Sequence, residues 1–242
     1  MTQLRVLSYN VRGLRDDVPV LAEIVRRCRP DVLVVQEAPA VLRWRSKCAA
    51  LARTCGLVYV AGGRTAGGNL LLCHQRISVH GVSEQRIPQR LRDPIRGVVA
   101  ATLGEGSLRF GVVGIHLGLS AEGRRREVGE VLATTRSFGD LPVIVAGDLN
   151  EHPDGPSWKA FTEAGLRDLG VDGAVATFPA GGPSARIDGI FASGERIVGR
   201  GCGVPESAGL ADAGDPEDPS DLGADFVQAS DHLPVLAVLD IS

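Results

Sequence analysis

The chain has 242 residues, 44% of them hydrophobic, and a formal net charge of −3 at pH 7. This length and apolar content exclude a disordered or fibrous protein and suffice for a buried core. The weakly acidic balance argues against a general nucleic-acid binder, which normally carries a basic surplus. No leader peptide opens the sequence and no window reaches the roughly 18 apolar residues of a membrane span, so we expect a cytoplasmic monomer without an integral membrane segment. The five cysteines form no CxxC pair and are interpreted as buried thiols.

The first 37 residues predict a strand, a helix and a strand. Residues 4–9, "LRVLSY", are typical of a strand that ends at Asn10. Apolar residues then recur at helical spacing, with Asp17 as a candidate N-cap and Pro30 where the helix should stop. The continuous apolar run "DVLVVQE" (31–37) predicts a buried strand that ends in Glu37.

The same order of elements recurs about a hundred residues later, as a weak internal repeat. A strand over 108–116 ends in His116, a helix covers 120–138, and the strand "PVIVAGDLN" (142–150) ends in Asp148 and Asn150. Because Asp148 and Asn150 are two residues apart, an extended backbone would direct both side chains to the same face.

Most other segments are short, β-branched and bounded by turn residues. About ten strands with about four helices predict an α+β fold of two packed sheets covered by helices on their outer faces. We expect one domain over residues 1–242, with a mobile acidic loop at 205–225. The further predicted strands are 56–61, 67–74, 77–87, 96–103, 186–193, 196–204 and 233–241, and the further helices are 40–55 and 156–165.

Polar side chains end several of the apolar strands. A buried carboxylate without a partner costs more free energy than its strand gains, so each of these groups either faces water or binds a cation. For a single strand end, exposure to water is the simpler interpretation. If the last strand is antiparallel to the others, the strand ends meet its start, "SDH", at one edge, and this convergence favours a site. The converging residues are Asn10, Glu37, His116, Asp148, Asn150, Asp231 and His232.

The chemistry of such a group indicates a hard cation and a phosphate ester. Oxygen ligands without thiolates suit Mg²⁺ or Mn²⁺, which bind one or two carboxylates together with substrate phosphate. The histidines lack the HxxxH or HExxH spacing of zinc ligands. Histidine transfers protons near neutral pH, so acid-base or phosphate-binding roles are expected.

A set of motifs in order along nearly the whole chain resembles the endonuclease/exonuclease/phosphatase superfamily, the DNase I-like fold. The resemblance implies a four-layer αββα sandwich with the active site at one edge of its two sheets. It is closer to the histidine-containing branches than to the abasic-site repair branch, which usually carries tyrosine at the position of His116. Gly189 stands where many relatives have tyrosine. The motifs are "SYNVRGL" (8–14), "VVQE" (34–37), "GGNLLL" (67–72), "IHLG" (115–118), "VAGDLNEHP" (145–153), "RIDGIF" (186–191) and "SDHLPV" (230–235).

The resemblance also implies roles for individual residues. Glu37 resembles the principal metal ligand, with Asn10 and Asp231 close to the metal or its waters. Asp148 and Asn150 resemble the pair that orients water and phosphate or holds a second metal. Asp188 resembles the carboxylate that fixes the tautomer of His232. The remaining expected contacts to the substrate phosphate come from His116, which can also help protonate the leaving oxygen, and from Arg96 and Arg186.

The expected reaction is direct in-line attack of water on phosphorus, with His232 as general base and Mg²⁺ or Mn²⁺ stabilising charge. The substrate class stays open among nucleic acid, nucleotide, inositol phosphate and phospholipid headgroup. The acidic loop either repels long polyanions or is an insertion of no consequence, and the arginines at 124–126 either contact phosphate or form a solvated helix face. A catalytically silent binding or scaffold protein on the same fold is the alternative.

Overall fold

The structure is a computed structural model that describes residues 1–88, 94–170, 175–205 and 226–242. Apart from Pro205, the predicted acidic loop lies outside the described residues. No helix in the described part of the chain is long and apolar enough to cross a membrane.

The strands form two six-stranded mixed sheets. The first sheet has the order β11-β12-β1-β2-β4-β3. Its strands are β1 (Thr2–Asn10), β2 (Val32–Gln36), β3 (Val58–Gly62), β4 (Leu70–Cys73), β11 (Ile197–Gly203) and β12 (Val235–Ile241). The second sheet has the order β5-β6-β7-β8-β10-β9. Its strands are β5 (Ser78–Ile87), β6 (Arg96–Glu105), β7 (Leu108–His116), β8 (Val143–Asp148), β9 (Leu166–Asp168) and β10 (Asp188–Ser193).

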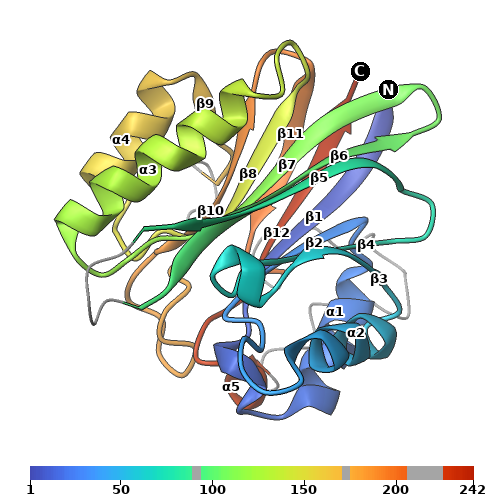
Figure 1. Cartoon of the computed structure of the whole chain (residues 1–242), viewed down its shortest axis with the longest axis vertical. Helices are drawn as coiled ribbons and strands as arrows, with labels where there is room; N and C mark the ends of the chain where they lie inside the picture. The colour runs from blue at the N-terminus through green and yellow to red at the C-terminus, as the bar shows by residue number, and fades with distance from the viewer. Residues whose placement is uncertain (89–93, 171–174, 206–225) are drawn as a thin grey trace.

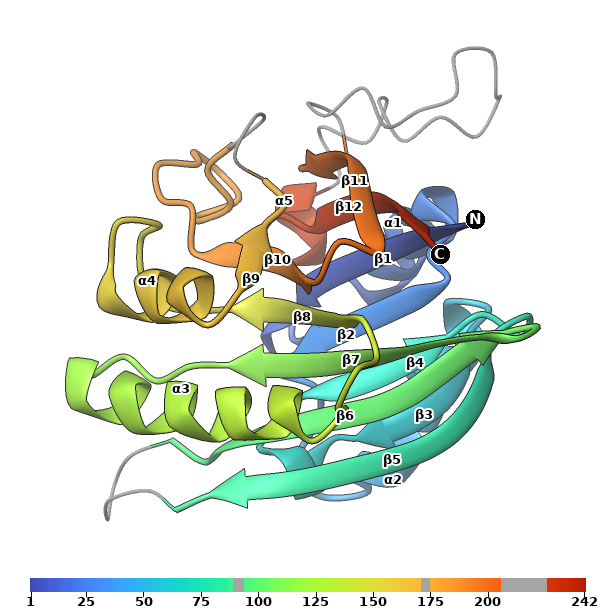
Figure 2. The ribbon, with the colours of Figure 1, turned by 90° about the horizontal axis from the view of Figure 1, so that it is seen from above.

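Helices cover the outer face of each sheet, so that the molecule has four layers (Figure 1). The helices α1 (Val18–Cys28), α2 (Trp44–Thr54) and α5 (Phe226–Ala229) pack on the first sheet, and α3 (Ala121–Arg136) and α4 (Pro156–Glu163) pack on the second. Figure 2 shows α3 and α4 side by side outside the second sheet. Short 3₁₀ turns follow β1 and β3, as η1 (Arg12–Leu14) and η2 (Arg64–Ala66). The predicted α+β sandwich is confirmed.

The alternation of side chains along β1 explains why the layers form. Leu4 and Val6 belong to the apolar cluster between the two sheets, whereas Leu7 and Tyr9 belong to the cluster under α1 and α2. Because successive strand residues point to opposite faces, one strand supplies both cores. Each fully buried large side chain contributes about 1.5–3 kcal/mol, so these clusters fix the packing of the sheets around the site.

The predicted ends of the first helix are confirmed. The side chain of Asp17 accepts a hydrogen bond from the backbone N–H of Val20 (3.0 Å), which satisfies a donor at the helix start. The helix ends at Cys28, and Arg29 adopts a left-handed conformation (φ 44°) just before Pro30. This helix returns the chain from β1 to the parallel strand β2.

Strand directions bring the polar strand ends to one edge of each sheet. β2 runs parallel to β1, while β12 runs antiparallel to β1, so the condition under which the strand ends meet the start of the last strand is fulfilled. In the second sheet β8 is parallel to β7, and β10 is antiparallel to β8. Sequence patterns missed β9, which has only three residues, and α5, which has four, because neither is long enough to show a period.

Candidate active site

Three neighbouring strands of the second sheet place polar residues in one row. His116 at the end of β7 is the register partner of Asp148 at the end of β8, and Asp148 is the partner of Asp188 at the start of β10. All three side chains are buried, with relative exposures of 4%, 1% and 2%. Polar groups this deeply buried need partners, so the row is not a solvated edge.

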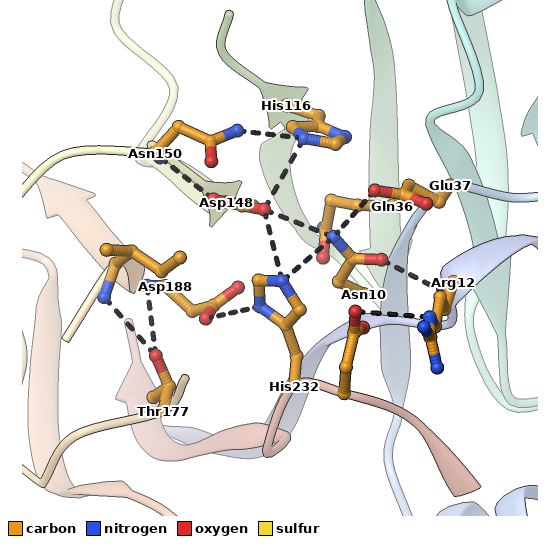
Figure 3. A network of polar contacts seen from close by, with 12 residues as sticks. Asn10, Arg12, Gln36, Glu37, His116, Asp148, Asn150, Thr177, Asp188 and His232 are labelled. Atoms are coloured by element: carbon orange, nitrogen blue, oxygen red, sulfur yellow. Dashed lines mark hydrogen bonds and ion pairs between the residues drawn. The ribbon is translucent and has the colours of Figure 1, made fainter. Parts of the chain in front are cut away.

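The first sheet contributes a second set of residues to the same place (Figure 3). Asn10, the last residue of β1, is buried and is paired in register with Gln36. Glu37 follows Gln36, is exposed, and has a left-handed backbone (φ 52°). Non-glycine residues rarely adopt that conformation, and they concentrate at functional sites.

His232 connects the two sets. Its Nδ1 lies 3.0 Å from Asp188 Oδ2, and its Nε2 lies 3.8 Å from Asp148 Oδ2 and 3.5 Å from the amide nitrogen of Asn10. The ring also packs against Phe178, with ring centroids 4.9 Å apart. A carboxylate on Nδ1 fixes the tautomer in which Nδ1 carries the proton and leaves Nε2 free to take one.

The side chain of Asn10 has a fixed orientation. Its Oδ1 accepts a hydrogen bond from the backbone N–H of Arg12 (3.1 Å), so the amide nitrogen must face the other way. That nitrogen donates to Asp148 Oδ2 (3.1 Å) and lies 3.4 Å from Glu37 Oε1. Asn10 therefore holds the two carboxylates from opposite sheets near each other.

Asn150 does not have the extended geometry that the spacing predicted. Its backbone is left-handed (φ 49°), and its N–H donates to Asp148 Oδ1 (2.8 Å). Its amide nitrogen donates to the carbonyl of Leu117 (2.9 Å) and lies 3.0 Å from His116 Nε2. The Asx turn thus moves the amide away from the carboxylate and onto His116 Nε2, which also lies 3.4 Å from Asp148 Oδ2.

Burial and charge separate the pKa values of the two histidines. Burial, together with the positive charges of Arg96 and His232, holds the pKa of His116 well below its usual value. Burial lowers the pKa of His232, but hydrogen bonding and charge from Asp188 and the charges of Asp148 and Asp231 outweigh that effect and raise it to about 9. Burial and the charge of Asp188 raise the pKa of Asp148 to about 7. The site therefore combines two imidazoles of opposite character: the pKa of His116 is lowered and that of His232 is raised.

The donor set fits a hard divalent cation. Asp148, Asp188 and His232 offer ligand atoms within 4.8 Å of one another, a possible metal-binding cluster. Glu37 adds an exposed carboxylate that forms no ion pair with any described residue and receives only the long contact from Asn10. Carboxylate oxygens without thiolates are the ligands that Mg²⁺ and Mn²⁺ prefer.

The two predicted arginines have different surroundings. Burial lowers the pKa of Arg96, the first residue of β6, although the negative charges of three carboxylates oppose that shift. These carboxylates are Glu127, Asp148 and Glu37. Its buried Nε has no hydrogen-bond partner in the described structure. Arg186 instead makes a two-point ion pair with Asp168 (2.6 and 2.8 Å) and packs over the ring of Trp158. The predicted phosphate contact from Arg186 therefore finds no support, because its guanidinium is already engaged.

Asp231 and Arg124 also have partners that the sequence did not indicate. Asp231 Oδ2 lies 3.2 Å from Arg12 Nε, with the carboxylate side chain 36% exposed. Arg124 is an ion-pair partner of Glu151 (3.0 Å), and its side chain is only 13% exposed, so it is not part of a solvated face.

Sequence reasoning missed three residues that support the site: Arg12, Thr177 and Phe178. The hydroxyl of Thr177 accepts hydrogen bonds from the backbone N–H groups of Ile187 (3.3 Å) and Asp188 (3.4 Å). No periodicity marks this loop, and only its position before the "RID" motif could have drawn attention to it.

Comparisons with known proteins concern the family and the fold. The sequence profile described as the Endonuclease/Exonuclease/phosphatase family matches residues 7–232. An endonuclease/exonuclease/phosphatase from Bacteroides vulgatus has a similar structure (TM-score 0.77, 18% identity, 100% of both chains covered). So does a mannosyl-6-phosphatase from Bacteroides thetaiotaomicron (TM-score 0.74, 20% identity, 98% of this chain and 99% of that chain). D. rerio TDP2, complexed with a single-strand DNA product, is a further neighbour (TM-score 0.67, 16% identity, 99% of this chain and 100% of that chain). A search of curated proteins gave no match.

Proposed function

This chain belongs to the endonuclease/exonuclease/phosphatase family, and we propose that it is a Mg²⁺- or Mn²⁺-dependent hydrolase of phosphate esters. Water attacks phosphorus directly and in line, and no covalent intermediate forms. The observation that carries the proposal is the position of His232, with Asp188 on Nδ1 at 3.0 Å and Nε2 facing Asp148 and Asn10 between the two sheets.

His232 is the general base of this reaction. Nε2 takes a proton from the attacking water, and Asp188 stabilises the resulting imidazolium. A base must be neutral to act, while the negative charge around His232 raises its pKa to about 9. The pH at which the rate rises therefore reports the pKa of His232, which the surrounding charges set.

Glu37 and Asp148 would hold the metal, with Asn10 and Asp231 close to it or to its waters. Asn10 acts by orienting the two carboxylates, because its own amide oxygen is bound to the N–H of Arg12. When bound, Mg²⁺ or Mn²⁺ supplies positive charge that stabilises the phosphoryl oxygens and the leaving group, and it offsets the negative charge near His232.

Asn150, His116 and Arg96 bind the substrate phosphate. Arg96 is half-buried and its Nε has no described partner, which suits a charge-assisted bond from this guanidinium to a phosphoryl oxygen. His116 Nε2 accepts from Asn150 and its pKa is low, so His116 contacts substrate as a neutral ring and does not protonate the leaving oxygen. In that contact the Nδ1–H of His116 would donate a hydrogen bond to a phosphoryl oxygen.

The substrate is a phosphate ester carried by a nucleic acid, a nucleotide, an inositol phosphate or a phospholipid headgroup. Two structural neighbours differ in the phosphate ester that their names indicate, since one is a mannosyl-6-phosphatase and another was solved with a single-strand DNA product. Fold similarity supports phosphate esters as a class and does not select among them.

The test is hydrolysis of bis(p-nitrophenyl) phosphate and p-nitrophenyl phosphate with Mg²⁺, with Mn²⁺ and with EDTA. We expect metal-dependent turnover, lost in His232→Ala and Asp148→Asn variants that keep the wild-type circular dichroism. Activity that survives both substitutions would refute the site, whereas metal-independent binding of phosphate esters without any turnover would favour a binding protein. A panel of plasmid DNA, RNA, nucleotides, inositol phosphates and sphingomyelin then identifies the substrate.

A further inference from the structure

Glu151 and Arg124 link the two loops that carry His116 and Asn150. Glu151 Oε1 lies 3.0 Å from both Nε and Nη2 of Arg124, and the two side chains are only 9% and 13% exposed. Arg124 also donates to the carbonyls of Gly118 (3.1 Å) and Leu119 (2.6 Å), in the loop that follows His116. The guanidinium therefore connects the loop after β7 to the loop after β8.

The other groups of Glu151 fix the loop after β8 to α4. Oε2 accepts from the backbone N–H of Ser157 (2.6 Å), the second residue of α4, and the Glu151 carbonyl accepts from the indole N–H of Trp158 (2.8 Å). The residue before the helix is Gly155, so no side chain caps the helix from that position. A Cβ there would come within 2.3 Å of Glu151 Cγ, which shows how closely the backbone fits around this carboxylate.

Asn150 depends on the placement of both loops. Its amide nitrogen bonds to the carbonyl of Leu117 and to His116 Nε2 across the gap between them, and its left-handed backbone is one that asparagine tolerates but does not favour. Glu151, the next residue, makes no hydrogen bond or ion pair with His116, Asp148 or His232 among the described residues. The bonds of Glu151 and Arg124 connect Glu151 to the site through Asn150 and the loop after His116.

We propose that Glu151 is a positioning residue, which with Arg124 holds Asn150 against His116 in the geometry that receives the substrate phosphate. The inference rests on the proposed function for its kinetic consequence. Its structural part, that Glu151 sets the Asn150–His116 contact, stands separately. A shift of the contact by about 1 Å is enough to lower kcat/KM by ~10- to 100-fold.

The structural part is tested by NMR of Glu151→Gln, which keeps the size of the side chain and removes its charge. The Asn150 side-chain amide and the His116 ring resonances should shift. The matched control is Asp31→Asn. This substitution weakens the ion pair of Asp31 with Arg76 (2.6 Å) and the hydrogen bond that Asp31 accepts from the backbone N–H of Arg5 (2.8 Å). Neither Asp31 nor Arg76 makes a described hydrogen bond or ion pair with a residue of the site. Resonances that stay in place in Glu151→Gln, or that move equally in Asp31→Asn, would overturn the proposal. If Glu151→Gln fails to fold, Arg124→Gln breaks the same link from the other loop and is judged by the same resonances.

The kinetic part is tested by a double-mutant cycle on bis(p-nitrophenyl) phosphate. Glu151→Gln should lower kcat/KM at least tenfold in the wild type and cause no further loss in an Asn150→Ala background. If Glu151→Gln lowered kcat/KM by the same factor in the wild type and in Asn150→Ala, Glu151 would not act through Asn150. A wild type without turnover would refute the proposed function and leave the NMR result to decide the position of Asn150.

Discussion

Asp148 and Asp188 are register partners on the antiparallel strands β8 and β10, yet only Asp188 makes a hydrogen bond with His232. Asp148 Oδ2 lies 3.8 Å from the other ring nitrogen and instead accepts from Asn10 (3.1 Å). Two carboxylates in matching places thus have different partners. Asp188 orients the histidine, whereas Asp148 binds the Asn10 amide nitrogen, which also contacts Glu37.

Replacing Asp188 with asparagine should lower the pKa of His232 and lower the rate. In metal-free protein the folded-state pKa, about 9, exceeds the ordinary value of 6.5, so protonation stabilises the fold. That contribution is complete below about pH 6.5 and is lost as the pH rises through about 9. Asp148 and His116 titrate outside most of this pH window, because the pKa of Asp148 is raised only to about 7 and that of His116 is lowered.

The measurements are a ring titration by NMR and urea unfolding between pH 6.5 and 9.5, both in EDTA. Stability should fall with pH in the wild type and less so in Asp188→Asn, and kcat should drop at least ~10²-fold. An unchanged ring pKa in Asp188→Asn would contradict the role of this carboxylate.

Glu37→Gln should weaken Mg²⁺ binding without loss of stability. The side chain is exposed and forms no ion pair in the described structure, so its charge contributes to ligand binding rather than to the fold. Isothermal titration calorimetry with MgCl₂ should show at least a tenfold higher Kd, with Glu163→Gln, an exposed carboxylate at the end of α4, as control. Equal affinity in the two variants would place the metal elsewhere.

Arg96→Gln and Arg186→Gln should separate binding from stability. Arg96 borders the site with an unpartnered Nε, so its loss should raise KM about tenfold and leave folding nearly unchanged. Arg186 is engaged with Asp168 and Trp158, so its loss should lower the melting temperature and leave KM close to wild type. A KM effect of the same size in both variants would remove this distinction.

Gly189→Ala should destabilise the protein by about 1–3 kcal/mol, because a Cβ would lie 2.7 Å from the ring of Trp158. Tyrosine, the residue expected here from the family resemblance, should be tolerated even less. Gly129→Ala is the matched control, since it lies in α3 with open space around its Cβ position, and it should stabilise the helix by about 0.5–1 kcal/mol. Chemical denaturation measures both values, and a neutral Gly189→Ala would mean that the Trp158 ring has room to move.

The sequence by itself determined which polar residues end the buried strands, and from them comes the chemistry that we propose. Apolar runs that stop at Asn10, Glu37, His116 and Asp148 predict polar groups at the ends of buried strands, since packing offers no reason for them. The sequence could place His232 at the same edge only on the condition that the last strand is antiparallel, and β12 fulfils that condition.

Tertiary structure alone decided which groups touch. The contact of Asp188 with His232 joins residues 44 positions apart, and that of Asn10 with Asp148 joins residues 138 apart and in different sheets. Spacing in a sequence fixes a side chain only relative to its own strand, and it failed where Asn150 left the extended conformation. Arg186 and Glu151 show the same limit, because the partners that decide their roles come from other elements of the fold.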